Sequence, residues 1–255
     1  MLNPVRPRMA SVALLCCGVQ FGSGRRGCGG CGVALDAFGD HALSCTSMGL
    51  YARHNVLRDT LATCCLSAGF PCRTEVQLPG TALVPADIFL PTLFNDAPTA
   101  VDVAVVHPLH PSHPAQAAMT TGAAAEARAA AKVAKYSESC RQRAWDYRAV
   151  VAETTGAWNQ AGQRLVRRLA REHALRSGVD PAEAAAGTWC ALSRALARAV
   201  GRQLVRARQQ GVGHPPGPPL GGGTAAAAPT VVSGRPGGPI SPGEGSAATA
   251  LVADR

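Results

Sequence analysis

The sequence predicts an α/β fold in which a helix is followed by three strands, a helix, a strand and two further helices. Three observations predict this order. Apolar residues recur every three or four positions over 51–68, two apolar runs lie at 84–90 and 100–106, and a segment rich in Ala, Glu, Lys and Arg precedes another apolar run at 147–154. At 255 residues the chain is long enough for one domain of moderate size with appendages.

Local signals place each element. Leu57, Leu61 and Cys65 form one apolar face of the first helix, and Gly69 ends it. The expected elements are strands at about 73–78, 84–90 and 100–106, a helix over about 116–143, a strand at 147–154, and helices at about 160–177 and 181–210. The prolines of 107–114 indicate an exposed loop between the third strand and the second helix.

Composition divides the chain into five segments. They are an N-terminal segment (1–25), a metal-binding loop (26–46), an α/β core (47–158), a basic helical extension (159–210) and a disordered tail rich in Gly, Pro and Ala (211–255). Arg6 and Arg8 precede an apolar run as in a targeting peptide, but no small-residue cleavage site follows, so a short leading helix is the alternative. No run reaches the roughly 18 apolar residues of a membrane span.

The net charge of +9 favours a polyanionic partner, either nucleic acid or an acidic membrane surface. Within 181–210, arginines recur every four residues and apolar side chains recur with the same period, offset by two, so the two stripes lie on opposite helix faces. The basic stripe is Arg194, Arg198, Arg202 and Arg206, and the apolar stripe is Leu192, Leu196, Val200 and Leu204. The basic stripe is a candidate nucleic-acid-binding face, with a solvated surface or a membrane-surface helix as alternatives.

Three cysteines and a histidine cluster near the N-terminus, as Cys28-x2-Cys31-x9-His41-x3-Cys45. Three thiolates and an imidazole suit a tetrahedral, structural Zn²⁺ site, and the surrounding glycines let the backbone turn around the ion. The alternative is a glycine-rich loop with incidental cysteines. The other cysteines form adjacent pairs or are scattered, which favours a reducing compartment over a disulfide framework.

Two aspartates, Asp87 and Asp102, lie inside the second and third apolar strands. A carboxylate among apolar residues is costly unless a cation meets it, and a divalent metal such as Mg²⁺ or Mn²⁺ is one such cation. If the turn centres on residues 95–96, the strands pair antiparallel and place Asp87 near Ala104 and Asp102 near Phe89, on one face. The alternative is that both aspartates form structural salt bridges.

Glu75, on the first strand, is the natural third carboxylate of such a metal site. Its alternative role is a pair with Arg73, two residues away. Carboxylates holding one or two Mg²⁺ ions, with a lysine nearby, are the arrangement that hydrolyses a phosphodiester. Lys132 and Lys135 are the only lysines in the chain, and both lie in the helix after the third strand.

These motifs, in this order, resemble the restriction-enzyme-like PD-(D/E)xK endonuclease domain that follows the reverse transcriptase in site-specific non-LTR retrotransposons. The matching features, over about 26–155, are the Cys-Cys-His-Cys knuckle, Arg53-His54-Asn55, the aspartate pair, and a helix that carries Lys132, Lys135 and Tyr136. The lysine expected two residues after the second acid is Ala104 here. Members of the family supply that lysine from the following helix, so the resemblance gives the role to Lys132 or Lys135.

The resemblance implies a small restriction-endonuclease-like core that nicks target DNA in the nucleus, with catalytic residues Glu75, Asp87, Asp102 and one of the two lysines. DNA is the expected partner, the RNA of a retroelement is a second candidate, and no small-molecule cofactor is expected. Arg53 and His54 would contact DNA phosphate or brace the metal site, unless they form only a polar cluster at the helix start. The alternatives are an inactive nucleic-acid-binding remnant and a stand-alone repair or recombination nuclease.

Overall fold

The computed structural model describes residues 26–94, 97–110, 113, 119–210 and 212–213. The elements are β1 (Arg26–Gly27), α2 (Asp40–Ser44), a 3-10 turn η1 (Thr46–Met48), α3 (Leu50–Ser67), β2 (Arg73–Val76), β3 (Ala86–Phe94), β4 (Ala97–Val106), α5 (Ala123–Arg141), β5 (Asp146–Glu153), α6 (Gln160–Ser177), α7 (Pro181–Gln210) and β6 (Val212–Gly213). The predicted α/β class and the order of elements are confirmed. The expectations for 1–25 and 214–255 lie outside the described residues.

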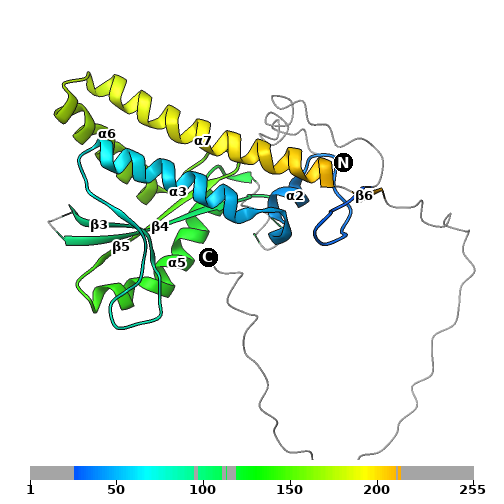
Figure 1. Ribbon diagram of the computed structural model, residues 1–255, viewed down its shortest axis with the longest axis horizontal. Coiled ribbons are helices and arrows are strands. Elements are labelled where there is room, and N and C mark those ends of the chain that lie inside the picture. The colour runs from blue at the N-terminus through cyan, green and yellow to red at the C-terminus, as the bar shows by residue number, and fades with distance from the viewer. Residues whose placement is uncertain (1–25, 95–96, 111–112, 114–118, 211, 214–255) are drawn as a thin grey trace, which may run out of the picture. The chain divides into compact units, whose positions relative to one another are not determined.

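A four-stranded mixed sheet, in the order β2-β3-β4-β5, is the centre of the fold (Figure 1). β3 pairs antiparallel with both β2 and β4, and β5 pairs parallel with β4 after the α5 crossover. Ala100 and Ala104 of β4 pack on the side of α5, whereas Val101 and Val103 pack among residues of α3, α6 and α7. Alternate side chains of β4 therefore pack into two separate apolar layers, one on each face of the sheet.

The pairing of β3 with β4 corrects the predicted register. Ile88 pairs with Val101, whereas Phe94 pairs with Ala97, so the register shifts within β3. If the pairing of Ile88 with Val101 is continued by one residue, Asp87 lies opposite Asp102 rather than opposite Ala104. A displacement of two residues keeps Phe89 and Ala104 together on one face and Ile88 on the other, because the side-chain period of a strand is two. The predicted alternation fails at Ala86, which packs with Phe89 rather than with Ile88.

The two C-terminal helices are part of the same core. Leu165 of α6 and Leu192 of α7 belong to one buried cluster with Leu57 of α3 and Ile88 of β3. The predicted apolar stripe of α7 is buried, and the four arginines of its basic stripe are exposed. Residues 159–210 therefore complete the domain rather than extend from it. Within the described part of the chain, no helix is both long and apolar enough to span a membrane.

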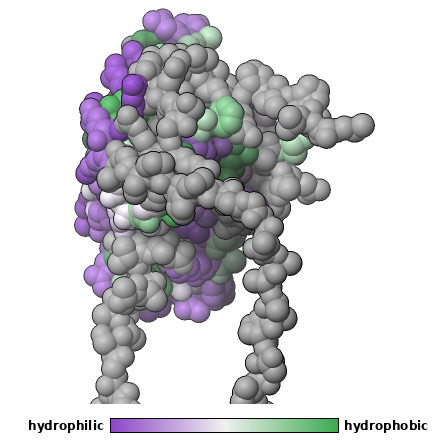
Figure 2. All heavy atoms as spheres, turned by 90° about the vertical axis from the view of Figure 1, so that its right-hand side faces the viewer, coloured by the Kyte–Doolittle hydropathy of each residue, from purple (hydrophilic) through white to green (hydrophobic). Residues whose placement is uncertain are grey.

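The metal-binding loop is tied to this core from two directions. β1 pairs antiparallel with β6, just after α7, and the imidazole of His107 lies 3.2 Å from Asp40 Oδ1 and 2.7 Å from Thr154 Oγ1. His107 and Pro108 are buried, and the other described residues of 107–114 are only partly exposed, so the expectation of an exposed loop is wrong for the start of this segment. On the face drawn in Figure 2, hydrophilic residues predominate along one edge of the described surface.

Candidate metal and catalytic sites

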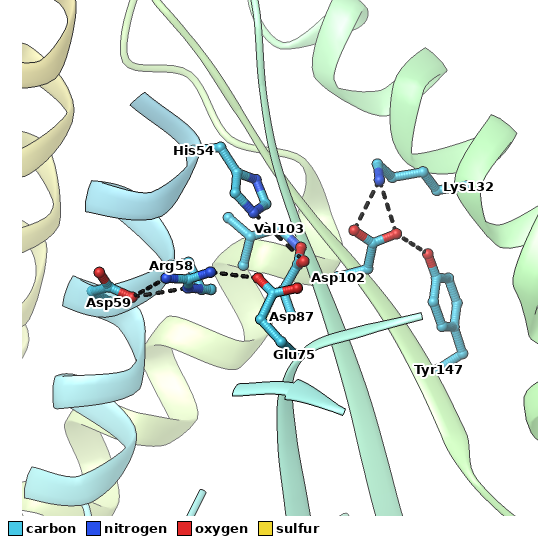
Figure 3. Close-up of polar contacts among 9 residues, drawn as sticks. All are labelled: His54, Arg58, Asp59, Glu75, Asp87, Asp102, Val103, Lys132 and Tyr147. Carbon is cyan, nitrogen blue, oxygen red and sulfur yellow. Dashed lines mark hydrogen bonds and ion pairs between the residues drawn. The ribbon is translucent and has the colours of Figure 1, made fainter. Parts of the chain in front are cut away.

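Asp102, in the middle of β4, is buried at 5% exposure. Lys132 Nζ of α5 donates to both of its carboxylate oxygens, at 2.8 and 2.9 Å, and the hydroxyl of Tyr147 on β5 donates to Oδ2 at 2.5 Å (Figure 3). Burial raises the pKa of Asp102, the positive charge of Lys132 opposes that change, and the nearby charge of Asp87 adds to it. The predicted carboxylate and one predicted lysine therefore meet on the α5 side of the sheet.

The structure separates the two candidate lysines. Lys132 is 4% exposed and lies against Asp102, whereas Lys135 is exposed, with Nζ 5.1 Å from the centre of the Tyr136 ring. They are three residues apart on α5, but only Lys132 points toward the sheet. Lys132 is thus the lysine that the fold brings to Asp102.

Asp87 lies near the start of β3, between α3 and β4. Its Oδ2 accepts a hydrogen bond from the backbone N–H of Val103 at 2.7 Å, and its Oδ1 lies 3.5 Å from His54 Nε2. Burial works to raise the pKa of Asp87, but the hydrogen bond and charge of His54, with further hydrogen bonds from Asp102 and Val103, lower it overall. Asp87 is therefore held as a carboxylate next to an imidazole.

Glu75 of β2 completes a second group with these residues. One ligand atom each from His54, Glu75 and Asp87 can be chosen so that all lie within 4.8 Å of one another. Glu75 forms an ion pair with Arg58 of α3 and not with Arg73, whose guanidinium lies 5.3 Å from the centre of the Phe89 ring. Glu75 also has a φ of +54°, a backbone conformation that non-glycine residues seldom adopt and that occurs often at functional sites.

Arg53 requires a correction, because it is 3% exposed and cannot reach a DNA phosphate from this position. Its guanidinium donates to the carbonyl oxygens of Leu43 and Val105 and to Gln203 Oε1, all within 3.1 Å. Burial lowers the pKa of Arg53 to about 10. These contacts join α2, α3, β4 and α7, so Arg53 braces the junction of the metal-binding loop and the core, a role that the sequence did not predict.

The four predicted zinc ligands lie together. Cys28 Sγ is 3.8 Å from Cys45 Sγ, Cys45 Sγ is 3.6 Å from Cys31 Sγ, and Cys31 Sγ is 3.2 Å from His41 Nε2. Tetrahedral geometry with Zn–S bonds of about 2.3 Å and Zn–N bonds of about 2.0 Å separates such atoms by roughly 3.8 Å for S···S and 3.5 Å for S···N. The cluster could therefore hold a zinc ion with little rearrangement.

Local structure explains this geometry. Asp36 Oδ2 accepts the N–H of His41 at 2.7 Å, and its Oδ1 accepts the N–H groups of Phe38 and Asp40, which holds the first turn of α2 behind the histidine. A Cβ on Gly30 would lie 2.3 Å from Ser47 Cβ, so this part of the loop needs glycine. Burial disfavours the Cys28 thiolate, but backbone hydrogen bonds from Gly30 and Cys31 outweigh it and lower the Cys28 pKa to about 7.

The position of His54 beside Asp87 was not indicated by the sequence. The sequence predicted that His54 would contact DNA phosphate or brace the metal site, with a polar cluster at the helix start as the alternative. The sequence feature that could have indicated this position is the spacing of four residues between His54 and Arg58, which puts both side chains on one face of α3. That face meets the ends of β2 and β3 in the structure (Figure 3).

No protein-family model matches the sequence, and no curated protein matches it. The fold and the candidate sites define the class of the protein. It is an α/β protein with a four-stranded mixed sheet and a Cys/His cluster that could hold zinc.

Proposed function

We propose that this chain is a metal-dependent DNA endonuclease derived from a retroelement, with a restriction-endonuclease-like core. The observation that carries the proposal is the meeting of Asp102, Lys132 and Asp87 from β4, α5 and β3. Two acidic groups on neighbouring strands with a lysine beside them suit phosphodiester hydrolysis. Structural elements from three separate parts of the chain contribute these groups, which supports a common role for them.

Each residue has a distinct part in this mechanism. Asp87 and Glu75 would hold the divalent ion, Mg²⁺ or Mn²⁺, which when bound would activate water and neutralise charge on the phosphate. Asp102, predicted from the sequence as a further ligand, is held by Lys132 and Tyr147 and would lie beside the ion. The amine of Lys132 keeps the Asp102 carboxylate oriented, and at 4% exposure it would stabilise charge on the phosphate from a distance rather than by direct contact. The hydroxyl of Tyr147 holds the same carboxylate from β5, so Asp102 is oriented from both sides.

The remaining features fit contact with DNA. In the proposed structural zinc site, Cys28, Cys31, His41 and Cys45 fill all four positions of a tetrahedral ion and leave none for chemistry. The exposed arginines of α7 offer guanidinium groups to phosphates, with target DNA as the partner and retroelement RNA as a second candidate. An enzyme that nicks chromosomal DNA would act in the nucleus.

Nicking of a supercoiled plasmid tests the proposal. The full chain is incubated with Mg²⁺ or Mn²⁺, and the wild type is compared with Asp87→Asn, Lys132→Ala and Lys135→Ala. We expect the first two substitutions to lower the nicking rate on the order of 100-fold or more. Lys135→Ala removes the same side chain three residues away, so it is the matched control and should retain the rate. Wild-type protein that binds the plasmid without nicking it contradicts the proposal.

One observation favours a second candidate, an inactive nucleic-acid-binding remnant. Lys132 contacts both oxygens of Asp102, and both residues are buried, as in a purely structural ion pair. In that case the zinc loop and the basic stripe of α7 would remain as a binding surface. A gel shift with unchanged plasmid topology in every metal tested is the result that this candidate predicts.

A further inference from the structure

We infer that His54, Glu75 and Asp87 form a binding site for a first-row divalent transition metal, of which Mn²⁺ is the probe, and that the imidazole of His54 makes the site prefer such an ion to Mg²⁺. The inference deepens the proposed function and rests on it for the catalytic use of the ion. Binding of the ion is measurable without DNA. The two claims can therefore fail separately.

The distances between the candidate ligand atoms of His54, Glu75 and Asp87 are close to those between the ligands of a bound metal ion. Cis ligands of an octahedral ion bonded at about 2.1 Å lie about 3 Å apart, and His54 Nε2 is 3.5 Å from Asp87 Oδ1. With Glu75 included, the three ligand atoms stay within 4.8 Å of one another. Glu75 is exposed, and a small rotation of its carboxylate that keeps the contact with Arg58 would bring the set to bonding distance while α3, β2 and β3 keep their positions.

Neighbouring groups orient the two carboxylates. The backbone N–H of Val103 holds Oδ2 of Asp87, which turns Oδ1 toward His54. Arg58, one helical turn after His54, holds Glu75 from α3. Contacts of this kind fix the direction of metal ligands in known sites. Figure 3 shows the three side chains converging from their separate elements.

Asp102 is next to this site but is not one of its ligands. Both of its oxygens accept hydrogen bonds from Lys132, and Oδ2 also accepts one from Tyr147. Exchanging these partners for an ion would leave a lysine amine buried at 4% exposure without its carboxylate. The third ligand of the ion is therefore His54, on the more open side of Asp87.

The donor set determines the kind of ion. Mg²⁺ prefers oxygen ligands and binds imidazole poorly, whereas transition-metal dications accept imidazole and carboxylate together. His54 and Asp87 are partly exposed, and Glu75 is exposed. Solvent thus reaches the site, and three protein ligands leave coordination positions for water and for a phosphate oxygen.

The experiment is a Mn²⁺ titration of the zinc-loaded full chain, with free Mn²⁺ followed by electron paramagnetic resonance. Pulsed spectra of the bound ion report nitrogen coupling from a coordinated imidazole. The variants are His54→Ala and, as a matched control on α6, His173→Ala. Thermal melts of both variants show whether they remain folded. Competition with Mg²⁺ gives the relative affinity, and plasmid nicking is measured on the same samples.

We expect wild type and His173→Ala to bind Mn²⁺ with nitrogen coupling, and Mg²⁺ to displace it only in large excess. His54→Ala should lose the coupling and bind Mn²⁺ about tenfold or more weakly, with a smaller loss for Mg²⁺. Unchanged Mn²⁺ affinity in folded His54→Ala, or bound Mn²⁺ without nitrogen coupling in the wild type, overturns the inference even if the plasmid is nicked. Coupling that depends on His54 without any nicking upholds the inference and refutes the proposed nuclease.

Discussion

Replacing Lys132 with Met should destabilise the domain strongly, because the change leaves Asp102 as a buried carboxylate without its cation. The two side chains are only 5% and 8% exposed, and two hydrogen bonds join them. Removing one partner of a buried ion pair costs about 3–5 kcal/mol. With a urea m-value of about 2–3 kcal/mol/M, the unfolding midpoint should fall by about 1–2.5 M. Tryptophan fluorescence in a urea titration measures that midpoint.

Two companion variants make this test specific. Lys135→Met makes the same change on the exposed side of α5, so its midpoint should move by about 0.2 M or less. Asp102→Asn combined with Lys132→Met removes both charges. The free energy of unfolding of this double variant should exceed that of Lys132→Met alone by at least about 2 kcal/mol, and the double variant should remain inactive in the nicking assay. The reasoning is refuted if Lys132→Met and Lys135→Met unfold at the same urea concentration.

Three further outcomes are expected. Native mass spectrometry should detect bound zinc in the wild type and in Cys190→Ser, an exposed thiol outside the cluster, but not in Cys31→Ser; zinc retained by Cys31→Ser contradicts the assigned ligand set. Arg53→Met should lower the free energy of unfolding by roughly 2–4 kcal/mol, because two buried acceptors and one partly buried acceptor lose their donor; a decrease below about 0.5 kcal/mol in chemical denaturation would show that Arg53 is not a brace. Arg198→Gln with Arg202→Gln should weaken DNA binding and make the slope of log K against log salt concentration shallower, by about 0.9 for each phosphate that the protein no longer neutralises; an unchanged salt slope would remove the basic stripe from the interface.

The faces of the strands could be predicted from the sequence, but the partners across them could not. The alternation along β4 correctly placed Asp102 and Ala104 on one side and the valines on the other. The register could not be read, because the irregularity between Leu90 and Phe94 has no pattern that distinguishes it from a regular turn. The choice between Lys132 and Lys135 also required the structure, because it depends on how α5 is rotated above the sheet.

The position of His54 shows why sequence patterns could not identify the proposed third ligand. Arg53 anchors α3 through the Val105 carbonyl of β4, and two residues earlier on that strand the Val103 N–H holds Asp87. The adjacent residue, His54, is thereby set against Asp87 by contacts that join residues far apart in the chain. Such contacts leave no periodic signal in the sequence. If this anchor positions the ligand, Arg53→Met should weaken Mn²⁺ binding as well as folding, and folded Arg53→Met protein that binds Mn²⁺ like the wild type would separate the two roles.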